Sequence, residues 1–368
     1  MQPTPPPALT GKNFNNINFF RIFFTLVIVY GHIIQHFMMP MYGHLPFFEK
    51  MSHHVSYGFG YMCDMFFIIS GFFMFFSFQK HKTLPELVLS KVARLTPVLL
   101  VSLVGMGVLS LIFPDVIFYK YQNVLALLFL DDAVIANFPS NNGAAWYINI
   151  LFWGAIFYFF LLKAISKNKS VLALIVFFAY TILLNKMNLY AQPQVWLDGL
   201  VTIFMLRGIA GMGLGYLIGD WYNSRPAPTD TPSRQAAWGF TLLEGTMLFF
   251  IFKFAIRRAL PFNFANMTVC FIVLFFCFLT KKGHISQLTD RKIIFTLGKY
   301  CFSIYMMQEV MFCFLKHTFW QEASFVAAHP VLTLIISMAV ICALGLITYY
   351  AVEKPAFAFC KEQIKKRF

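Results

Sequence analysis

The stretch INFFRIFFTLVIVYGHIIQHFM, from Ile17 to Met38, decides the fold of this chain. About 20 mostly apolar residues, each adding about 1.5 Å to a helix, are enough to cross the hydrocarbon core of a bilayer. The stretch has this length, and Arg21 is its one permanently charged residue. We therefore predict that it forms a transmembrane helix.

Further apolar stretches of similar length follow along the whole chain. Of the 368 residues, 59% are hydrophobic and only 12% are charged, whereas a soluble domain carries roughly 25% charged residues. A water-soluble fold of this composition would expose apolar surface that aggregates. We predict an all-α, polytopic membrane bundle of about ten transmembrane helices, at residues 17–38, 58–79, 96–113, 145–162, 170–187, 199–219, 238–256, 264–280, 293–315 and 330–352.

The remaining segments flank or interrupt this membrane domain, which we place at residues 17–358. Residues 1–16 are polar and rich in proline and have no signal-peptide pattern, so we predict a disordered tail. Residues 359–368 form a basic tail. The apolar run 122–130 is too short to cross a bilayer, and we predict that it is interfacial or re-entrant.

The distribution of lysine and arginine predicts the orientation. The net charge is +14, and most basic residues fall in the tails and in the loops on the same side as the two termini. Basic loops stay in the cytoplasm, so we place both termini there. An excess of positive charge on the cytoplasmic side is expected for a protein whose partner is the lipid bilayer. The net charge therefore does not indicate binding to nucleic acid.

The cysteines do not predict a metal site or a disulfide framework. No pair has the CxxC spacing, and most lie inside apolar runs, where a thiol is a small buried side chain. We expect no metal cofactor. The seven are Cys63, Cys270, Cys277, Cys301, Cys313, Cys342 and Cys360.

Arg21 and His32 are the first candidates for a functional site, because ionisable groups inside a membrane are costly. Their spacing corresponds to about 1100° of helical rotation, so they share one face and lie about 16 Å apart along the axis. Histidine suits general-base catalysis, and a guanidinium suits phosphate or carboxylate recognition. Alternatively, Arg21 extends to the headgroups and His32 bonds a neighbouring helix.

Three further residues are candidates in other spans. Asp64 could orient a histidine, pair with an arginine or face headgroups, while the following Ser70-Gly71 pair favours close helix packing. Arg207 lies among glycines deep in its span and needs a partner, so it is a candidate substrate-binding residue. Trp146, at the outer end of the fourth span, is either a substrate contact or part of the interfacial aromatic belt.

Lys91 and Arg94 precede the third predicted span and are spaced three residues apart, which places them on one helical face. Together they could bind the phosphates of a nucleotide. The alternative is that they are ordinary cytoplasmic positive charges.

The order of these residues resembles the membrane acyltransferase-3 family. Arg21 and His32 are followed by Asp64-Met-Phe-Phe-Ile-Ile-Ser70-Gly71-Phe72 and by Lys91-x-x-Arg94-Leu-x-Pro97. Cys301-Phe-Ser303-Ile-Tyr305 and Glu353-Lys354-Pro355 resemble the closing motifs of that family.

The resemblance implies an O-acyltransferase that moves acetyl from cytoplasmic acetyl-CoA to a cell-surface glycan, such as lipopolysaccharide or peptidoglycan, or to a lipid-linked sugar, in the bacterial inner membrane. It implies that His32 is the catalytic histidine, with Arg21 beside it in a donor site that also contains Lys91 and Arg94. Our own hypothesis adds that Asp64 orients His32, that Arg207 holds the acceptor or the thioester oxygen, and that Trp146 contacts the substrate. The basic Lys91 stands where the family has a first arginine.

Two departures leave the subtype and the acceptor open: Leu151 stands where many members have a glutamate, and Gln308 where many have a histidine. A transporter or flippase of a lipid-linked sugar is the alternative function, because buried Arg and His also line permeation paths. The absence of visible internal repeats argues against it. A non-catalytic scaffold is the third reading.

Overall fold

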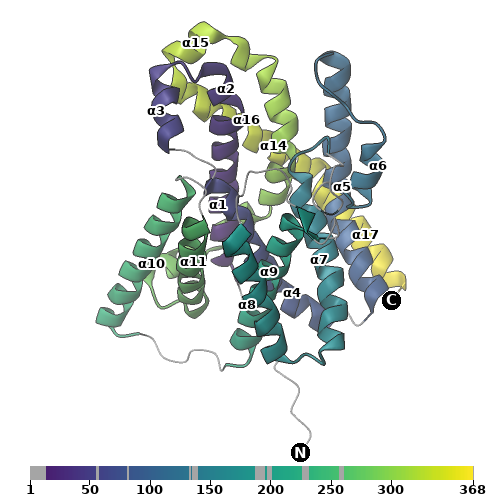
Figure 1. The fold of residues 1–368 in the computed structure, drawn as a ribbon, viewed down its shortest axis with the longest axis vertical. Helices are drawn as coiled ribbons and strands as arrows, with labels where there is room; N and C mark the ends of the chain where they lie inside the picture. Colours follow the sequence, from purple (N-terminus) through teal and green to yellow (C-terminus); the bar gives the residue numbers. More distant parts are fainter. Residues whose placement is uncertain are drawn as a thin grey trace, which may run out of the picture.

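The structure, a computed structural model, describes residues 14–54, 58–80, 83–131, 134, 140–186, 195–196, 201–225, 232–256 and 261–367. Nearly all of these residues are helical (Figure 1). The first half contains α1 (Ile17–His32), the π-helix η1 (Ile33–Met38), α2 (Met39–Tyr42), α3 (Pro46–His54), the short η2 (Gly58–Tyr61), α4 (Met62–Lys80), α5 (Leu84–Ile112), α6 (Gln122–Leu127), α7 (Ala145–Ala164) and α8 (Lys169–Lys186).

The second half begins with a two-residue antiparallel pair, β1 (Val195–Trp196) and β2 (Val201–Thr202). It continues with α9 (Ile203–Asn223), α10 (Arg234–Ala255), α11 (Pro261–Thr280), α12 (His284–Leu288), α13 (Lys292–Gly298), α14 (Cys301–Lys316), η4 (Phe319–Gln321), α15 (Ala323–Ala328), α16 (Pro330–Thr348), the π-helix η5 (Tyr349–Glu353) and α17 (Lys354–Arg367).

The structure confirms an all-α polytopic membrane bundle. Among the described residues, eight helical stretches are long and apolar enough to cross a membrane: Ile17–Tyr42, Gly58–Lys80, Leu84–Ile112, Ala145–Ala164, Ile203–Asn223, Arg234–Ala255, Asn263–Thr280 and Pro330–Ile364. The other two predicted spans are also helical but shorter. The predicted span 170–187 is α8, and the predicted span 293–315 is divided into α13 and α14 by a turn at Lys299–Tyr300.

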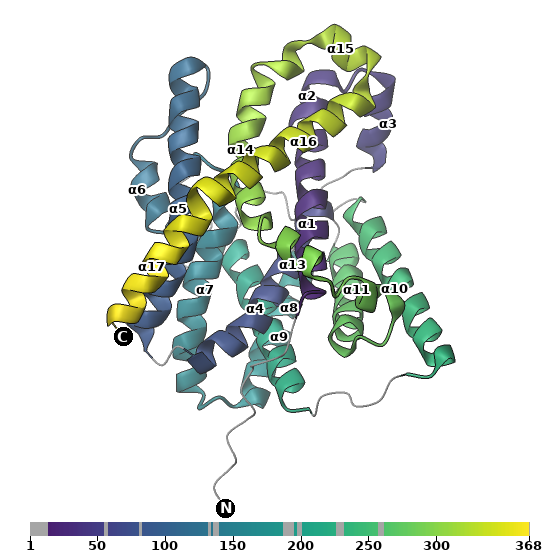
Figure 2. The same cartoon turned by 180° about the vertical axis from the view of Figure 1, so that it is seen from behind.

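Three boundaries differ from the sequence prediction. Helix α5 begins at Leu84, well before residue 96, so Lys91, Arg94 and Pro97 all lie within it. Helix α17 continues the last span, so the residues from 359 to Arg367 are helical, and Figure 2 shows α16 and α17 as one slanting rod. Phe14 packs its ring against Phe72, so the packed chain begins before residue 17.

The closest helix packing is between α4 and α9, where small residues let the backbones touch. A Cβ atom on Gly71 would lie 2.0 Å from the carbonyl oxygen of Met212, and one on Gly215 would lie 2.0 Å from that of Ile68. The prediction that Ser70-Gly71 permits close approach is therefore confirmed at Gly71. Small residues at such contacts are typical of helix pairs in membranes, where van der Waals packing drives association.

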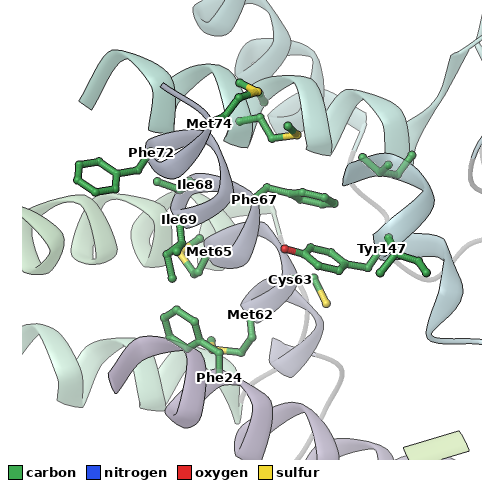
Figure 3. Packing of buried hydrophobic residues seen from close by; sticks show 14 of the residues in the cluster. Phe24, Met62, Cys63, Met65, Phe67, Ile68, Ile69, Phe72, Met74 and Tyr147 are labelled. Atoms are coloured by element: carbon green, nitrogen blue, oxygen red, sulfur yellow. The ribbon is translucent and has the colours of Figure 1, made fainter. Parts of the chain in front are cut away.

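Helix α4 lies at the centre of the core. Its buried side chains pack between Phe24 of α1 and Tyr147 of α7 (Figure 3). Phe20 and Phe24 of α1 in turn make edge contacts with Phe271 of α11. This aromatic packing fixes α1, which carries Arg21 and His32, against the centre of the bundle.

Candidate functional site

Arg21 lies at the end of the bundle that the charge distribution assigns to the cytoplasm, which we call the inner end. Its Nη1 donates to Asn18 Oδ1 at 3.2 Å, and its guanidinium lies 4.9 Å from the ring centre of Phe73. Arg94 of α5 and Tyr147 of α7 are close enough to interact electrostatically with it. Arg21 is thus directed to the helices around it.

The closing motifs meet at the same place. Ser303 Oγ donates to Glu353 Oε2 at 2.5 Å, and the charge of Arg94 acts on that carboxylate. Glu353 is the last residue of the π-helix η5, and π-helical turns are frequent at functional sites because they displace the next side chains from the regular helical register.

Ser70 completes this group through the hydroxyl of Tyr147, since the two oxygens lie 3.2 Å apart. Tyr147 interacts in turn with both Arg21 and Arg94. We call this group the inner polar cluster because it contains Arg21; Tyr147 follows Trp146 at the start of α7, so the group extends from the inner end into the interior of the bundle. Its members are Arg21, Ser70, Arg94, Tyr147, Ser303 and Glu353. Residues spread over six elements of the chain are therefore gathered at one point, including one from each motif that the sequence analysis identified.

The cluster and its flank carry an excess of positive charge. Lys91 lies close enough to Arg94 for their charges to repel, and Glu353 is a carboxylate on which the charge of Arg94 acts. Arg94 is exposed, and Lys91 is partly exposed. An anion such as a phosphate would relieve the repulsion among these cations, and arginine can bind it bidentately.

His32 lies at the end of α1, where the π-helix η1 begins. Its Nδ1 is 3.2 Å from Oε1 of Gln308 on α14, and its ring makes edge contacts with the rings of Phe59 and Phe312. The histidine therefore bonds a neighbouring helix, which was one of the two alternatives predicted from the sequence. Its ring is partly exposed and is held in a defined orientation by these contacts.

Asp64 and Arg207 pair with each other. Arg207 Nε donates to Asp64 Oδ1 at 2.9 Å, and Nη2 donates to Asp64 Oδ2 at 2.6 Å and to the carbonyl oxygen of Gly60 at 3.0 Å. Both side chains are almost completely buried. The sequence left open whether Asp64 orients a histidine, pairs with an arginine or faces headgroups, and in the structure it pairs with Arg207. Among the described contacts, His32 is held by Gln308 and not by Asp64.

Trp146 belongs to this ion pair as well. The guanidinium carbon of Arg207 lies 5.0 Å from the centre of the Trp146 ring and 5.9 Å from that of Phe204. The predicted substrate residues Arg207 and Trp146 are thus brought together with Asp64. The guanidinium already has protein partners, so its contact with a substrate stays a prediction.

Glu309 is a carboxylate that the sequence analysis did not single out. It lies on α14 next to Gln308, and a Cβ atom on Gly143 would be 3.6 Å from its Oε1. Its side chain is partly buried. A carboxylate inside the apolar run 293–315 is the signal that could have found it.

The described residues contain no group of three or more His, Cys, Asp or Glu side chains that could hold a metal ion. The arrangement instead offers two chemical environments. One is the cationic inner polar cluster, and the other is a histidine held by an amide farther along α1.

Residues 14–350 match the family model described as an acyltransferase domain. The chain belongs to the acyltransferase-3 family. No curated protein and no solved structure matches it. This multi-pass membrane acyltransferase is therefore a member of the family that its sequence motifs resemble. The match begins at Phe14, which is also the first residue that the structure describes.

Proposed function

We propose that this acyltransferase transfers an acetyl group from cytoplasmic acetyl-CoA to a hydroxyl of a cell-surface glycan or a lipid-linked sugar, in the inner membrane of a bacterium. The observation that carries the proposal is the inner polar cluster. It presents Arg21 and Arg94, flanked by Lys91, at the end of the bundle that the charge distribution assigns to the cytoplasm. The negative charge of the phosphates of coenzyme A complements these cations.

His32 is the catalytic base in this proposal. It lies on the same face of α1 as Arg21, about 16 Å farther along the axis, which is roughly the reach of a pantetheine arm. A donor whose phosphates are bound at the inner end would place its thioester beside the imidazole. Histidine suits this step because the unperturbed pKa of its side chain is near neutral.

His32 is the only proton carrier that this transfer needs. The acceptor hydroxyl gives its proton to the imidazole as its oxygen bonds to the thioester carbonyl carbon. The carbon–sulfur bond then breaks, and the leaving thiolate takes the proton from the imidazolium. The products are an O-acetyl ester and free CoA, and the base is regenerated.

Membrane vesicles of the expressing strain supply the acceptor for the test. Vesicles with the wild-type protein, given acetyl-CoA labelled in the acetyl group, should release free CoA and incorporate label into glycan. The His32→Ala variant should be slower by about 10²–10⁴-fold, the usual contribution of general-base catalysis.

Equal expression of the two proteins, measured by immunoblot, is the control. Wild-type activity in His32→Ala would exclude His32 as the base. Translocation of a lipid-linked sugar without any CoA release would favour the flippase alternative over the enzyme.

A further inference from the structure

Gln308 is the residue that holds His32, and it occupies the position at which the sequence departs from its family resemblance. It lies on α14, one turn beyond the Ser303-Ile-Tyr305 motif. Its side chain is completely buried. Its Oε1 is 3.2 Å from Nδ1 of His32.

This contact determines the tautomer of the imidazole. An amide oxygen can only accept a hydrogen bond, so with Oε1 of Gln308 facing the ring, Nδ1 of His32 carries the proton that it donates. In the neutral ring the lone pair is then on Nε2, which becomes the basic nitrogen. A general base is effective only when the nitrogen facing the acceptor hydroxyl is the unprotonated one.

The other end of the same amide is unused. Nε2 of Gln308 is buried and has no hydrogen-bond partner in the part of the chain that the structure describes. Such groups are rare in native proteins, because a buried donor without a partner loses its hydrogen bonds to water and gains nothing in return. Gln308 is therefore a buried amide of which only the oxygen has a partner among the described residues.

We propose that Gln308 is a second catalytic residue. This inference rests on the proposed acyl transfer and adds a role for a specific donor. Its Oε1 fixes the tautomer of His32, and its Nε2–H group donates to the carbonyl oxygen of the thioester. That oxygen becomes negatively charged when the acceptor oxygen bonds to the carbonyl carbon, and it returns to a carbonyl when the thiolate leaves.

An imidazole at position 308 could act in the same way. A neutral histidine ring has one acceptor nitrogen and one N–H donor, which is the combination that the Gln308 amide offers. A methionine has a similar length and offers no N–H donor. A glutamate keeps the acceptor oxygens and lacks the donor at neutral pH.

The experiment compares Gln308→Met, Gln308→Glu and Gln308→His with the wild type in purified protein in nanodiscs, using acetyl-CoA and an extract of the native glycan. We expect Gln308→Met to lower kcat by about 10²–10³-fold, as the loss of one oxyanion donor does, while the KM for acetyl-CoA stays within about 2-fold. Gln308→His should remain within about 10-fold of the wild-type kcat. Met307→Leu, a buried neighbour, is the matched control and should keep the wild-type rate.

A second measurement follows the protonation of His32 in the absence of substrate. Diethyl pyrocarbonate modifies unprotonated imidazole, so the pH dependence of His32 labelling, followed by mass spectrometry, gives the pH at which the ring loses its proton. In Gln308→Glu the carboxylate would stabilise the imidazolium, so the midpoint should move to higher pH. This readout does not require an active variant.

The outcomes separate the two levels of the proposal. Wild-type kcat in Gln308→Met, with His32→Ala inactive, would overturn the role of Gln308 and leave the acyl transfer standing. An unchanged labelling midpoint in Gln308→Glu would overturn the contact with His32. Absence of CoA release from the wild-type protein itself would be a failure of the proposed function.

Discussion

At the scale of single residues, Arg94 gives the sharpest test of the donor site. It is exposed, and its charge acts on both Arg21 and Glu353. We expect Arg94→Ala to raise the KM for acetyl-CoA roughly 10–100-fold, because a hydrogen bond to a charged group contributes about 1.5–3 kcal/mol. Arg94→Lys should recover part of this loss, since lysine keeps the charge without the bidentate geometry.

The measurement is the initial rate of CoA release as a function of acetyl-CoA concentration. Arg225, an exposed arginine over the ring of Trp221, is a matched control outside the cluster. Arg225→Ala should leave the KM unchanged. An equal rise of the KM in both variants would indicate a general effect of surface charge and would contradict a specific donor site.

The buried pair of Asp64 and Arg207 gives a second residue-scale prediction. Removing one partner leaves the other charge buried and unpaired, which typically costs about 3–5 kcal/mol. We expect Asp64→Leu and Arg207→Leu each to lower the thermal stability of the detergent-solubilised protein strongly. The double variant should be more stable than either single variant, because it leaves no unpaired charge.

This comparison also decides between the two roles of Arg207. If the double variant is stable and retains acyl transfer, the pair is structural. If it is stable and inactive with a raised KM for the acceptor, Arg207 binds the substrate as the sequence predicts. Equal stability of the single variants and the wild type would contradict the ion pair.

The sequence predicted part of this residue-scale description. The common face of Arg21 and His32 follows from helical geometry alone. The partner of Asp64 did not follow, because Arg207 is far away in the sequence and only the packing of α4 against α9 brings the two together. The contact between His32 and Gln308 was hidden for the same reason, since α1 and α14 lie at opposite ends of the chain.

At the scale of elements, the contact between α4 and α9 should be intolerant of any added side-chain atom. The Cβ of Gly215→Ala would lie 2.0 Å from the carbonyl oxygen of Ile68, and this oxygen is backbone, which cannot rotate away. We expect Gly215→Ala to reduce the yield of folded protein and to separate Asp64 from Arg207. Size-exclusion chromatography and thermal unfolding in detergent measure both effects.

Gly239→Ala is the control for this prediction. Nothing lies within 4 Å of the Cβ atom that would be added on α10. Alanine also has a higher helix propensity than glycine, by roughly 0.8–1 kcal/mol. Gly239→Ala should therefore be neutral or slightly stabilising, and a normal yield of Gly215→Ala would contradict the close α4–α9 packing.

Element positions were largely predictable, whereas their ends and breaks were not. Hydrophobicity locates each helix, since a bilayer leaves the backbone no other partner than itself. It does not report the interruption at Lys299–Tyr300, which separates α13 from α14. It also located only the apolar part of α5, from residue 96, because the polar and basic residues between Leu84 and that position are compatible with a helix but are not hydrophobic.

At the scale of the whole molecule, the contacts between helix ends indicate which elements cross the membrane. Asp115, just after α5, accepts a hydrogen bond from Nε2 of His317, just after α14, at 2.9 Å. At the other end of these helices, Arg94 and Cys301 both act on Arg21. Helices α5 and α14 therefore run in the same direction, from the inner end to the outer end.

This parallel course is what a crossing α14 would require, although the helix is short. Sixteen residues at about 1.5 Å each give about 24 Å, less than the hydrocarbon thickness of about 30 Å. Helix α8 is placed by a similar contact, because Lys169 at its start lies 2.6 Å from Asp220 at the end of α9. The two helices are therefore antiparallel, and the start of α8 lies at the same end as the end of α9.

The last prediction follows from these directions and concerns the number of crossings. If α8 and α14 both cross, the eight long helices become ten, an even number, and both termini lie in the cytoplasm with the basic loops. Green fluorescent protein fluoresces only when it folds in the cytoplasm, and alkaline phosphatase is active only outside it. We expect fusions at the C-terminus and after Lys282 to fluoresce, and a fusion after Gln321 to have phosphatase activity. Fluorescence from the fusion after Gln321 would show that α14 does not cross, and it would place His32 and Gln308 in a different relation to the acceptor side than the transfer reaction requires.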